Sequence, residues 1–248
     1  GKTTLFSDVG ARYFVIKPVF DVFAAIKTAD LGTPSVYGDA QTEWLTAGLR
    51  ASTATWKLVG SSVSFSPLIL DLAAPPLPYI QSLFSFVPQN FRQAFYFDVD
   101  DWDGFPVQKQ ALLRGVLGET GAITIAGDVH SSYVCEHPAA ENGKRSFDFT
   151  GGAISSGTWG EFTESAAQSV SPALVALVPR LDEALVEASS RDLAASQVKF
   201  ASTGEHAVSI MRVNAAGATV DFHLVPSIEG TGQNKVSVVG TRYYDNAA

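Results

Sequence analysis

The segment Ala122–Ala126 constrains the fold more than any other part of the sequence. Its residues, Ala-Ile-Thr-Ile-Ala, are almost wholly apolar, which is typical of a strand that is buried on both faces of a sheet. Apolar residues at helical spacing precede it over Val107–Leu117, and this pattern stops at Gly118, as helices often do at a glycine. A helix that leads directly into a buried strand predicts a layered α/β fold.

The rest of the chain continues this alternation. Strands are predicted where β-branched and aromatic residues cluster, and helices where apolar residues recur at a helical period. The predicted elements are strands at Ala11–Lys17, Trp56–Val59 and Ser146–Thr150, helices at Asp39–Ser52 and over about 161–198, and a hairpin of His206–Val213 with Thr219–Val225. The α/β class therefore applies to the whole chain.

Residues 67–106 break the alternation. Six of the 12 prolines lie there beside many aromatic residues. A loop of this length inside a compact domain is usually functional, and a linker would be less aromatic. The segment is therefore predicted to form a wall of a substrate cleft.

Composition excludes several classes of protein. Lys and Arg total 17 against 25 Asp and Glu, a net charge of -8, which opposes the phosphate contacts that nucleic-acid binding needs. The single cysteine, Cys135, cannot form an internal disulfide or a thiolate zinc site, and a buried side chain is expected there. No apolar run approaches the roughly 20 residues of a transmembrane helix.

The acidic run Asp98–Gly104 could suggest a calcium loop. Alignment of Gly104 with the invariant loop glycine places Val99 at the first ligand position and Gln110 at the last, and neither residue is a carboxylate. The spacing favours a solvated acidic turn before a helix, with Asp103 near the helix N-terminus. Which of these acids line a pocket stays open.

The most informative segment is Gly127-Asp-Val-His, which follows the buried strand directly. Ligands in open α/β sheets collect at the carboxyl ends of strands, and residues two apart can face the same way. Asp128 and His130 offer an oxygen and a nitrogen donor, a pair that suits a divalent or trivalent ion. A carboxylate that merely caps a turn is the structural alternative. A catalytic metal also needs three or more protein ligands.

Other candidate chemistries are weaker. Ser131 and Ser132 lack the G-x-S-x-G context of an activated nucleophile. Gly1-Lys-Thr-Thr imitates the end of a phosphate-binding loop, but the first half of that motif is absent. His137 precedes Pro138 in an expected loop, which predicts an exposed ring.

Several motifs, taken in order, resemble the C-terminal half of the PhoD-like alkaline phosphatases and phosphodiesterases. Each motif is short, but their ordered combination is specific and covers nearly the whole chain. They are Gly38-Asp-Ala-Gln-Thr-Glu-Trp-Leu, Trp56-Lys-Leu-Val, Trp102-Asp-Gly-Phe-Pro with Leu112-Leu113 after it, Ile125-Ala-Gly-Asp-Val-His-Ser-Ser, and Phe149-Thr-Gly-Gly-Ala-Ile-Ser-Ser.

The resemblance implies a calcineurin-like metallophosphoesterase core, an α/β sandwich of two sheets flanked by helices with metal ions at the strand ends. Residues 1–248 would form the C-terminal portion of one catalytic domain, since the family's N-terminal half has no counterpart before Gly1. Asp128 and His130 take the role of metal ligands, and Cys135 does not occupy the place of the family's cysteine ligand. The implied ions are iron and calcium.

The implied activity is metal-dependent hydrolysis of phosphate mono- or diesters. The implied partners are the phosphate ester substrate and the N-terminal half, either in the same protein or on a separate chain. Enzymes of this family are usually exported, so a periplasmic, cell-surface or extracellular location is expected. The alternative is a noncatalytic structural or assembly module that retains the fold, because a fold does not guarantee an activity.

Overall fold

The computed structural model describes residues 13–73, 88–170, 172–192, 194–225, 237–238 and 242–244. The Gly1-Lys-Thr-Thr motif lies outside these residues. The strands are β1 (Tyr13–Ile16), β2 (Leu58–Gly60), β3 (Ile69–Asp71), β4 (Ala94–Asp98), β5 (Ile123–Ala126), β6 (Ser132–Glu136), β7 (Phe147–Thr150), β8 (Gln197–Ser202), β9 (His206–Val213), β10 (Ala218–Val225), β11 (Ser237–Val238) and β12 (Arg242–Tyr244).

The helices alternate with the strands along the first two thirds of the chain. The α-helices are α2 (Lys17–Leu31), α3 (Gly38–Ala51), α5 (Pro106–Leu112), α6 (Gly118–Thr120), α7 (Trp159–Val170), α8 (Pro172–Val175) and α9 (Leu181–Ser190). The short 3-10 turns are η1 (Gln89–Phe91), η2 (Trp102–Gly104) and η4 (Val178–Arg180), and a π-helical turn is η3 (Leu113–Leu117). No helix in these described ranges is long and apolar enough to span a membrane.

A five-stranded sheet in the order β2-β5-β7-β6-β8 forms the centre of the described fold. Strands β2, β5 and β7 run parallel, with Gly60 opposite Ile125 and Ala126 opposite Thr150. The carboxyl ends of these strands therefore meet at one edge of the sheet. Strand β6 is antiparallel to both β7 and β8, so it starts at this same edge, where β8 ends.

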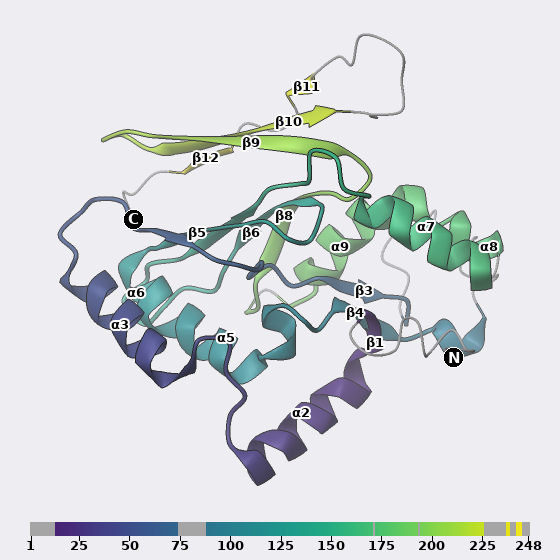
Figure 1. Cartoon of the computed structure of the whole chain (residues 1–248), viewed down its shortest axis with the longest axis horizontal. Coiled ribbons are helices and arrows are strands. Elements are labelled where there is room, and N and C mark those ends of the chain that lie inside the picture. The colour runs from purple at the N-terminus through teal and green to yellow at the C-terminus, as the bar shows by residue number, and fades with distance from the viewer. Residues whose placement is uncertain are drawn as a thin grey trace.

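Different layers cover the two faces of this sheet. Ile123, Val134 and Phe149 pack on one face against apolar side chains of the β9–β10 hairpin, including Phe222. Leu112, Leu113 and Leu117 belong to a cluster that covers Ala122 on the helical side. Figure 1 shows the hairpin on one side of β5, β6 and β8, and α3, α5 and α6 on the other. The mixed α/β class is confirmed.

A second sheet contains part of the segment that was predicted as a cleft wall. Strands β3 and β4 pair with each other, and β1 pairs with β4, all antiparallel. The side chains Phe95, Tyr96 and Phe97 are buried in β4. These aromatic residues therefore belong to a core, and a role of the other residues of 67–106 in a cleft wall stays a prediction. Residues 74–87 lie outside the described ranges.

The largest error of element type concerns α2. The strand predicted at Ala11–Lys17 ends at Ile16, and Pro18 lies in the first turn of a 15-residue helix, where its missing N–H is not needed. None of the α2 residues is buried. The helix therefore lacks the buried apolar face that a helical pattern of apolar residues usually marks. Strand β8 was also missed, because it begins inside the segment predicted as helical.

The helix predicted at Val107–Leu117 is interrupted and longer than expected. Gly115 has non-helical φ and ψ angles of -91° and -124° inside the π-helical turn, and glycine accepts such a conformation without side-chain clashes. The chain then continues through α6 to Gly121, whose φ of 64° ends the helix. Gly118 therefore lies inside the helical segment. By contrast, the predicted hairpin of β9 and β10 is confirmed.

Three carboxylates of the acidic run Asp98–Gly104 are buried, those of Asp98, Asp101 and Asp103, and only Asp100 is exposed, which corrects the prediction of a solvated turn. Asp103 forms an ion pair with Lys109 at 2.6 Å, and both side chains are about 5% exposed. Burial opposes the charge of Lys109, but the Asp103 and Asp101 carboxylates outweigh this effect and raise its pKa. Burial, together with the charge of Asp103, raises the pKa of Asp101 well above its ordinary value. Gly104 is required sterically, because a Cβ there would lie 1.8 Å from the Val99 carbonyl oxygen.

A buried carboxyl group joins the strand ends. Asp148 on β7 is fully buried and accepts hydrogen bonds of 2.5 to 3.0 Å from the hydroxyls of Thr124, Thr150, Ser64 and Ser66. These donors come from β5, from β7 and from the loop after β2. The cluster therefore holds β5, β7 and the loop after β2 together near the sheet edge at which the parallel strands end.

Replacing Asp148 with alanine should destabilise the protein by about 3 kcal/mol or more, because four hydroxyls would lose a buried acceptor. The quantity to measure is the free energy of unfolding in urea. The exposed Asp30, substituted in the same way, serves as the control and should change stability by less than about 0.5 kcal/mol. A loss below about 1 kcal/mol for Asp148→Ala would contradict the structural role of the cluster.

His137 is fully buried, which contradicts the expected exposed ring. Its Nδ1 atom lies 2.8 Å from Oγ of Ser196, the residue before β8. Burial, assisted by the positive charge of Lys109, lowers the pKa of His137 to about 3. Burial also raises the pKa of the neighbouring Cys135 thiol, so neither group offers a reactive site at neutral pH.

A histidine in the unfolded chain titrates near pH 6.5, so the unfolded state binds a proton below this pH. Folded His137 does not bind a proton until about pH 3. Stability should therefore fall with decreasing pH, with a contribution of up to about 1.4 kcal/mol per pH unit. His137→Gln removes the titrating group, so its loss of stability between pH 6.5 and pH 5 should be about 1.6 kcal/mol smaller than that of the unmodified protein. The free energy of unfolding is measured in urea at several pH values. If both proteins lost the same free energy of unfolding between pH 6.5 and pH 5, this result would argue against a neutral buried ring.

Candidate functional site

The segment Gly127–Ser131 links the carboxyl end of β5 to β6 through an unusual turn. Val129 N donates to Gly127 O at 2.9 Å, and the intervening Asp128 has a φ of 71°. This bond across three residues with a positive central φ defines a γ-turn of the rare, strained kind. His130 also has a positive φ, of 51°. Aspartate and histidine accept this region better than β-branched residues do, yet two such residues in one loop store strain, which is common at functional sites.

Both predicted ligands reach the surface at this loop. Asp128 and His130 are exposed, whereas Val129 between them is buried in the apolar cluster with Tyr133 and Trp159. The Asp128 carboxylate forms no hydrogen bond to any other residue that the structure describes. The buried Val129 therefore anchors the turn, and the alternation of exposure leaves the two polar side chains available to a ligand.

His130 is oriented through one ring nitrogen. Its Nδ1 atom lies 2.8 Å from the carbonyl oxygen of Gly157. Because a carbonyl oxygen only accepts hydrogen bonds, Nδ1 must donate, and Nε2 is left with the lone pair in the neutral ring. A histidine whose other nitrogen donates to a carbonyl is the usual arrangement of a metal ligand.

The loop after β7 provides this carbonyl. Residues 151–158 follow the carboxyl end of β7, which lies beside β5 in the sheet. The Ser132 hydroxyl accepts a hydrogen bond from Gly152 N at 3.1 Å, and a Cβ at Gly152 would lie only 3.0 Å from the same oxygen. Ser131 and Ser132 are fully buried, so neither is available as a nucleophile.

The end of this loop was not singled out by sequence reasoning. Thr158 and Glu161 exchange hydrogen bonds, Thr158 N to Glu161 Oε2 at 2.8 Å and Glu161 N to Thr158 Oγ1 at 3.2 Å. This is a capping box at the start of α7. The T-x-x-E pattern was a readable signal, but its link to His130 depends on the fold.

The donor set fits part of a metal centre. A carboxylate oxygen and an imidazole nitrogen with a free lone pair are suitable ligands for divalent or trivalent ions. Within the described ranges of the chain, no group of three or more His, Cys, Asp or Glu side chains is arranged to hold an ion. Asp128 and His130 would therefore need further ligands from elsewhere.

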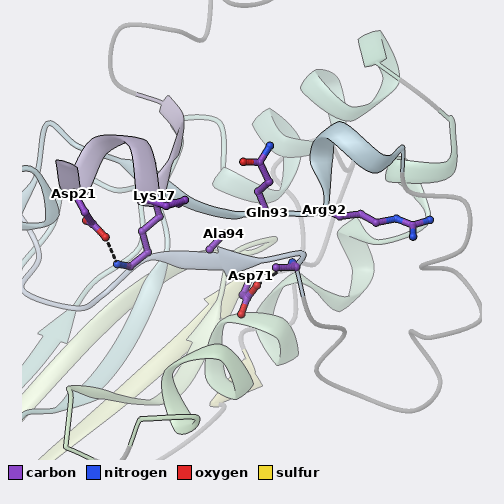
Figure 2. A pocket seen from close by; sticks show the side chains of 8 residues that line it. Lys17, Asp21, Asp71, Arg92, Gln93 and Ala94 are labelled. Carbon is purple, nitrogen blue, oxygen red and sulfur yellow. Dashed lines mark hydrogen bonds and ion pairs between the residues drawn. The ribbon is translucent and has the colours of Figure 1, made fainter. Parts of the chain in front are cut away.

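A separate cavity of about 400 Å³ lies between α2 and the β3–β4 pair. Figure 2 shows its lining, in which Lys17 points toward Asp21 at 2.6 Å. Asp71 is paired with Arg191. The lining residues are Lys17, Pro18, Asp21, Asp71, Ala73, Arg92, Gln93 and Ala94. None of them comes from the loops that carry Asp128 and His130, so this cavity is not part of the candidate metal centre.

Comparison with known proteins identifies the family. No curated protein matches this sequence. The sequence model of the PhoD-like phosphatases matches residues 23–216, most of the chain, and this range includes the β5–β6 turn, the loop after β7 and the capping box. The strained turn with its carboxylate and oriented imidazole therefore lies within the matched region, and the chain belongs to the PhoD-like phosphatase family.

Proposed function

We propose that the chain is the C-terminal portion of a metal-dependent hydrolase of phosphate mono- or diesters, an alkaline phosphatase or phosphodiesterase. The turn after β5 carries this proposal, because it exposes a carboxylate and an imidazole whose Nε2 makes no hydrogen bond to any residue in the described part of the chain. The family match supports the reaction class. The packing of the β9–β10 hairpin on the central sheet supports a two-sheet metallophosphoesterase core.

Asp128 would bind an ion through its carboxylate, and His130 would bind through Nε2. When bound, such ions polarise the phosphoryl group, lower the pKa of a water ligand and stabilise negative charge in the transition state. The chain's own contribution is to hold these two donors: Val129 anchors the turn, and the Gly157 carbonyl holds the His130 ring. Iron together with calcium is the metal content that we propose.

The remaining ligands are proposed to lie on the N-terminal half, in the same protein or on a separate chain. Supporting this, a catalytic site needs three or more protein ligands, whereas the described residues contain no such group. The substrate would then bind between the turn that carries Asp128 and His130 and the N-terminal half that supplies the remaining ligands. A periplasmic, cell-surface or extracellular location is proposed from the family alone.

Asp128→Asn in the full-length enzyme, with the N-terminal half present, should lower phosphatase activity by at least about a hundredfold and reduce bound metal. The reason is that loss of a direct ligand exceeds the 10- to 100-fold effect of outer partners. Activity on a phosphate monoester and a diester, with elemental analysis of the same preparation, measures both quantities. Asp39→Asn, at an exposed residue of α3, is the matched control and should change neither.

The incomplete ligand set also favours a second candidate, a noncatalytic module that retains the fold. Elemental analysis of the purified full-length protein separates the two. Transition metal in stoichiometric amount supports the enzyme. Protein that is free of metal and gains no phosphatase activity on reconstitution with iron and calcium supports the module.

A further inference from the structure

The support of the His130 ring extends beyond the Gly157 carbonyl. This carbonyl belongs to the same peptide group as the N–H of Thr158, which donates to Glu161 Oε2 at 2.8 Å. In a planar trans peptide the C=O and N–H bonds point in opposite directions. Glu161 therefore binds one end of this peptide group, and His130 binds the other at 2.8 Å.

The resulting chain of hydrogen bonds runs from a carboxylate through a peptide to an imidazole. Hydrogen bonds to ionised groups are stronger than those between neutral groups, and each bond in a chain polarises the next. The carboxylate of Glu161 thus makes the Gly157 carbonyl a better acceptor for Nδ1–H. Many metal-ligating histidines are oriented by a carboxylate that accepts their hydrogen bond directly. Glu161 has the same electronic effect on His130, but through the intervening peptide group.

The structure around α7 keeps this chain of bonds in place. Gly160 N donates to the Thr203 carbonyl oxygen at 2.7 Å, and a Cβ at Gly160 would lie 2.8 Å from the Gly204 Cα. The Trp159 ring stacks on Phe97 with a centroid distance of 5.2 Å. The first turn of α7 is therefore fixed to the end of β8 and to the aromatic core, which sets the backbone position of the exposed Glu161.

We propose that Glu161 is a positioning residue for His130. Through the Gly157–Thr158 peptide it keeps the proton of the neutral ring on Nδ1 and leaves the Nε2 lone pair free to bind a ligand. The role of this arrangement in ligand binding rests on the proposed metal-dependent function. The hydrogen-bonded relay itself is formed by residues of this chain and does not depend on that function.

The test is the tautomer of His130, measured by nitrogen-15 NMR on the full 248-residue chain labelled at histidine. The spectra are recorded at about pH 8.5, well above the range in which free histidine takes up a proton. His130→Gln identifies the signals by their disappearance. The unmodified protein should carry the proton mainly on Nδ1. Glu161→Ala should shift the tautomer ratio about two- to tenfold toward Nε2–H.

Two further variants separate the relay from general helix capping. Glu161→Gln retains an oxygen acceptor for Thr158 N–H and should largely restore the Nδ1–H tautomer. Thr158→Val removes the other hydrogen bond of the capping box but keeps its backbone N–H, so it should leave the ratio unchanged.

Three results would overturn the relay: a proton on Nε2 in the unmodified protein, an unchanged ratio in Glu161→Ala, or an equal shift in Thr158→Val. These results differ from a failure of the proposed function. If Asp128→Asn left activity and metal content intact while the tautomer data held, the relay would stand and the metal site would not.

Discussion

The parallel pairing of β2, β5 and β7 is the constraint on which the candidate site depends. Parallel strands place their carboxyl ends at one edge, so the loops that follow β5 and β7 meet although their first glycines, Gly127 and Gly151, are 24 positions apart in the sequence. Only this meeting lets the Gly157 carbonyl contact His130. A one-residue shift in the register of β7 would turn its apolar side chains to the polar face and its polar ones to the apolar face.

The two faces of the central sheet explain how that register is held. Phe149 and its neighbours on one face need only an apolar partner, which the β9–β10 hairpin supplies. On the opposite face Asp148, Thr124 and Thr150 are buried together, and polar groups there must find partners of defined geometry. The hydroxyl cluster around Asp148 satisfies this requirement with side chains from the converging segments. Polar pairing therefore specifies the alignment of the strand ends more narrowly than apolar packing does.

Sequence reasoning succeeded where a local pattern and the tertiary environment agree. The strand at Ala122–Ala126 and the β9–β10 hairpin follow from apolar runs, alternation and a turn-forming connection. It failed where the environment overrides the local pattern. The acidic run at Asp98–Gly104 resembles a solvated turn, but Lys109, six residues after Asp103, forms an ion pair with Asp103 inside the core. The helix α2 was missed because the strand pattern before it runs directly into Pro18, and proline is also common in the first turn of a helix.

The sequence by itself determined the chemistry at the turn after β5, because the buried strand, the glycine and the D-x-H spacing are all local. It also carried the order of motifs that places the chain among the PhoD-like phosphatases. Only the tertiary structure decided how His130 is oriented, since its partner Gly157 is 27 residues away and is held by a helix terminus packed against β8 and an aromatic core. Long-range contacts of this kind arise from the register of the sheet and the packing of its layers, and no spacing within a short motif encodes them.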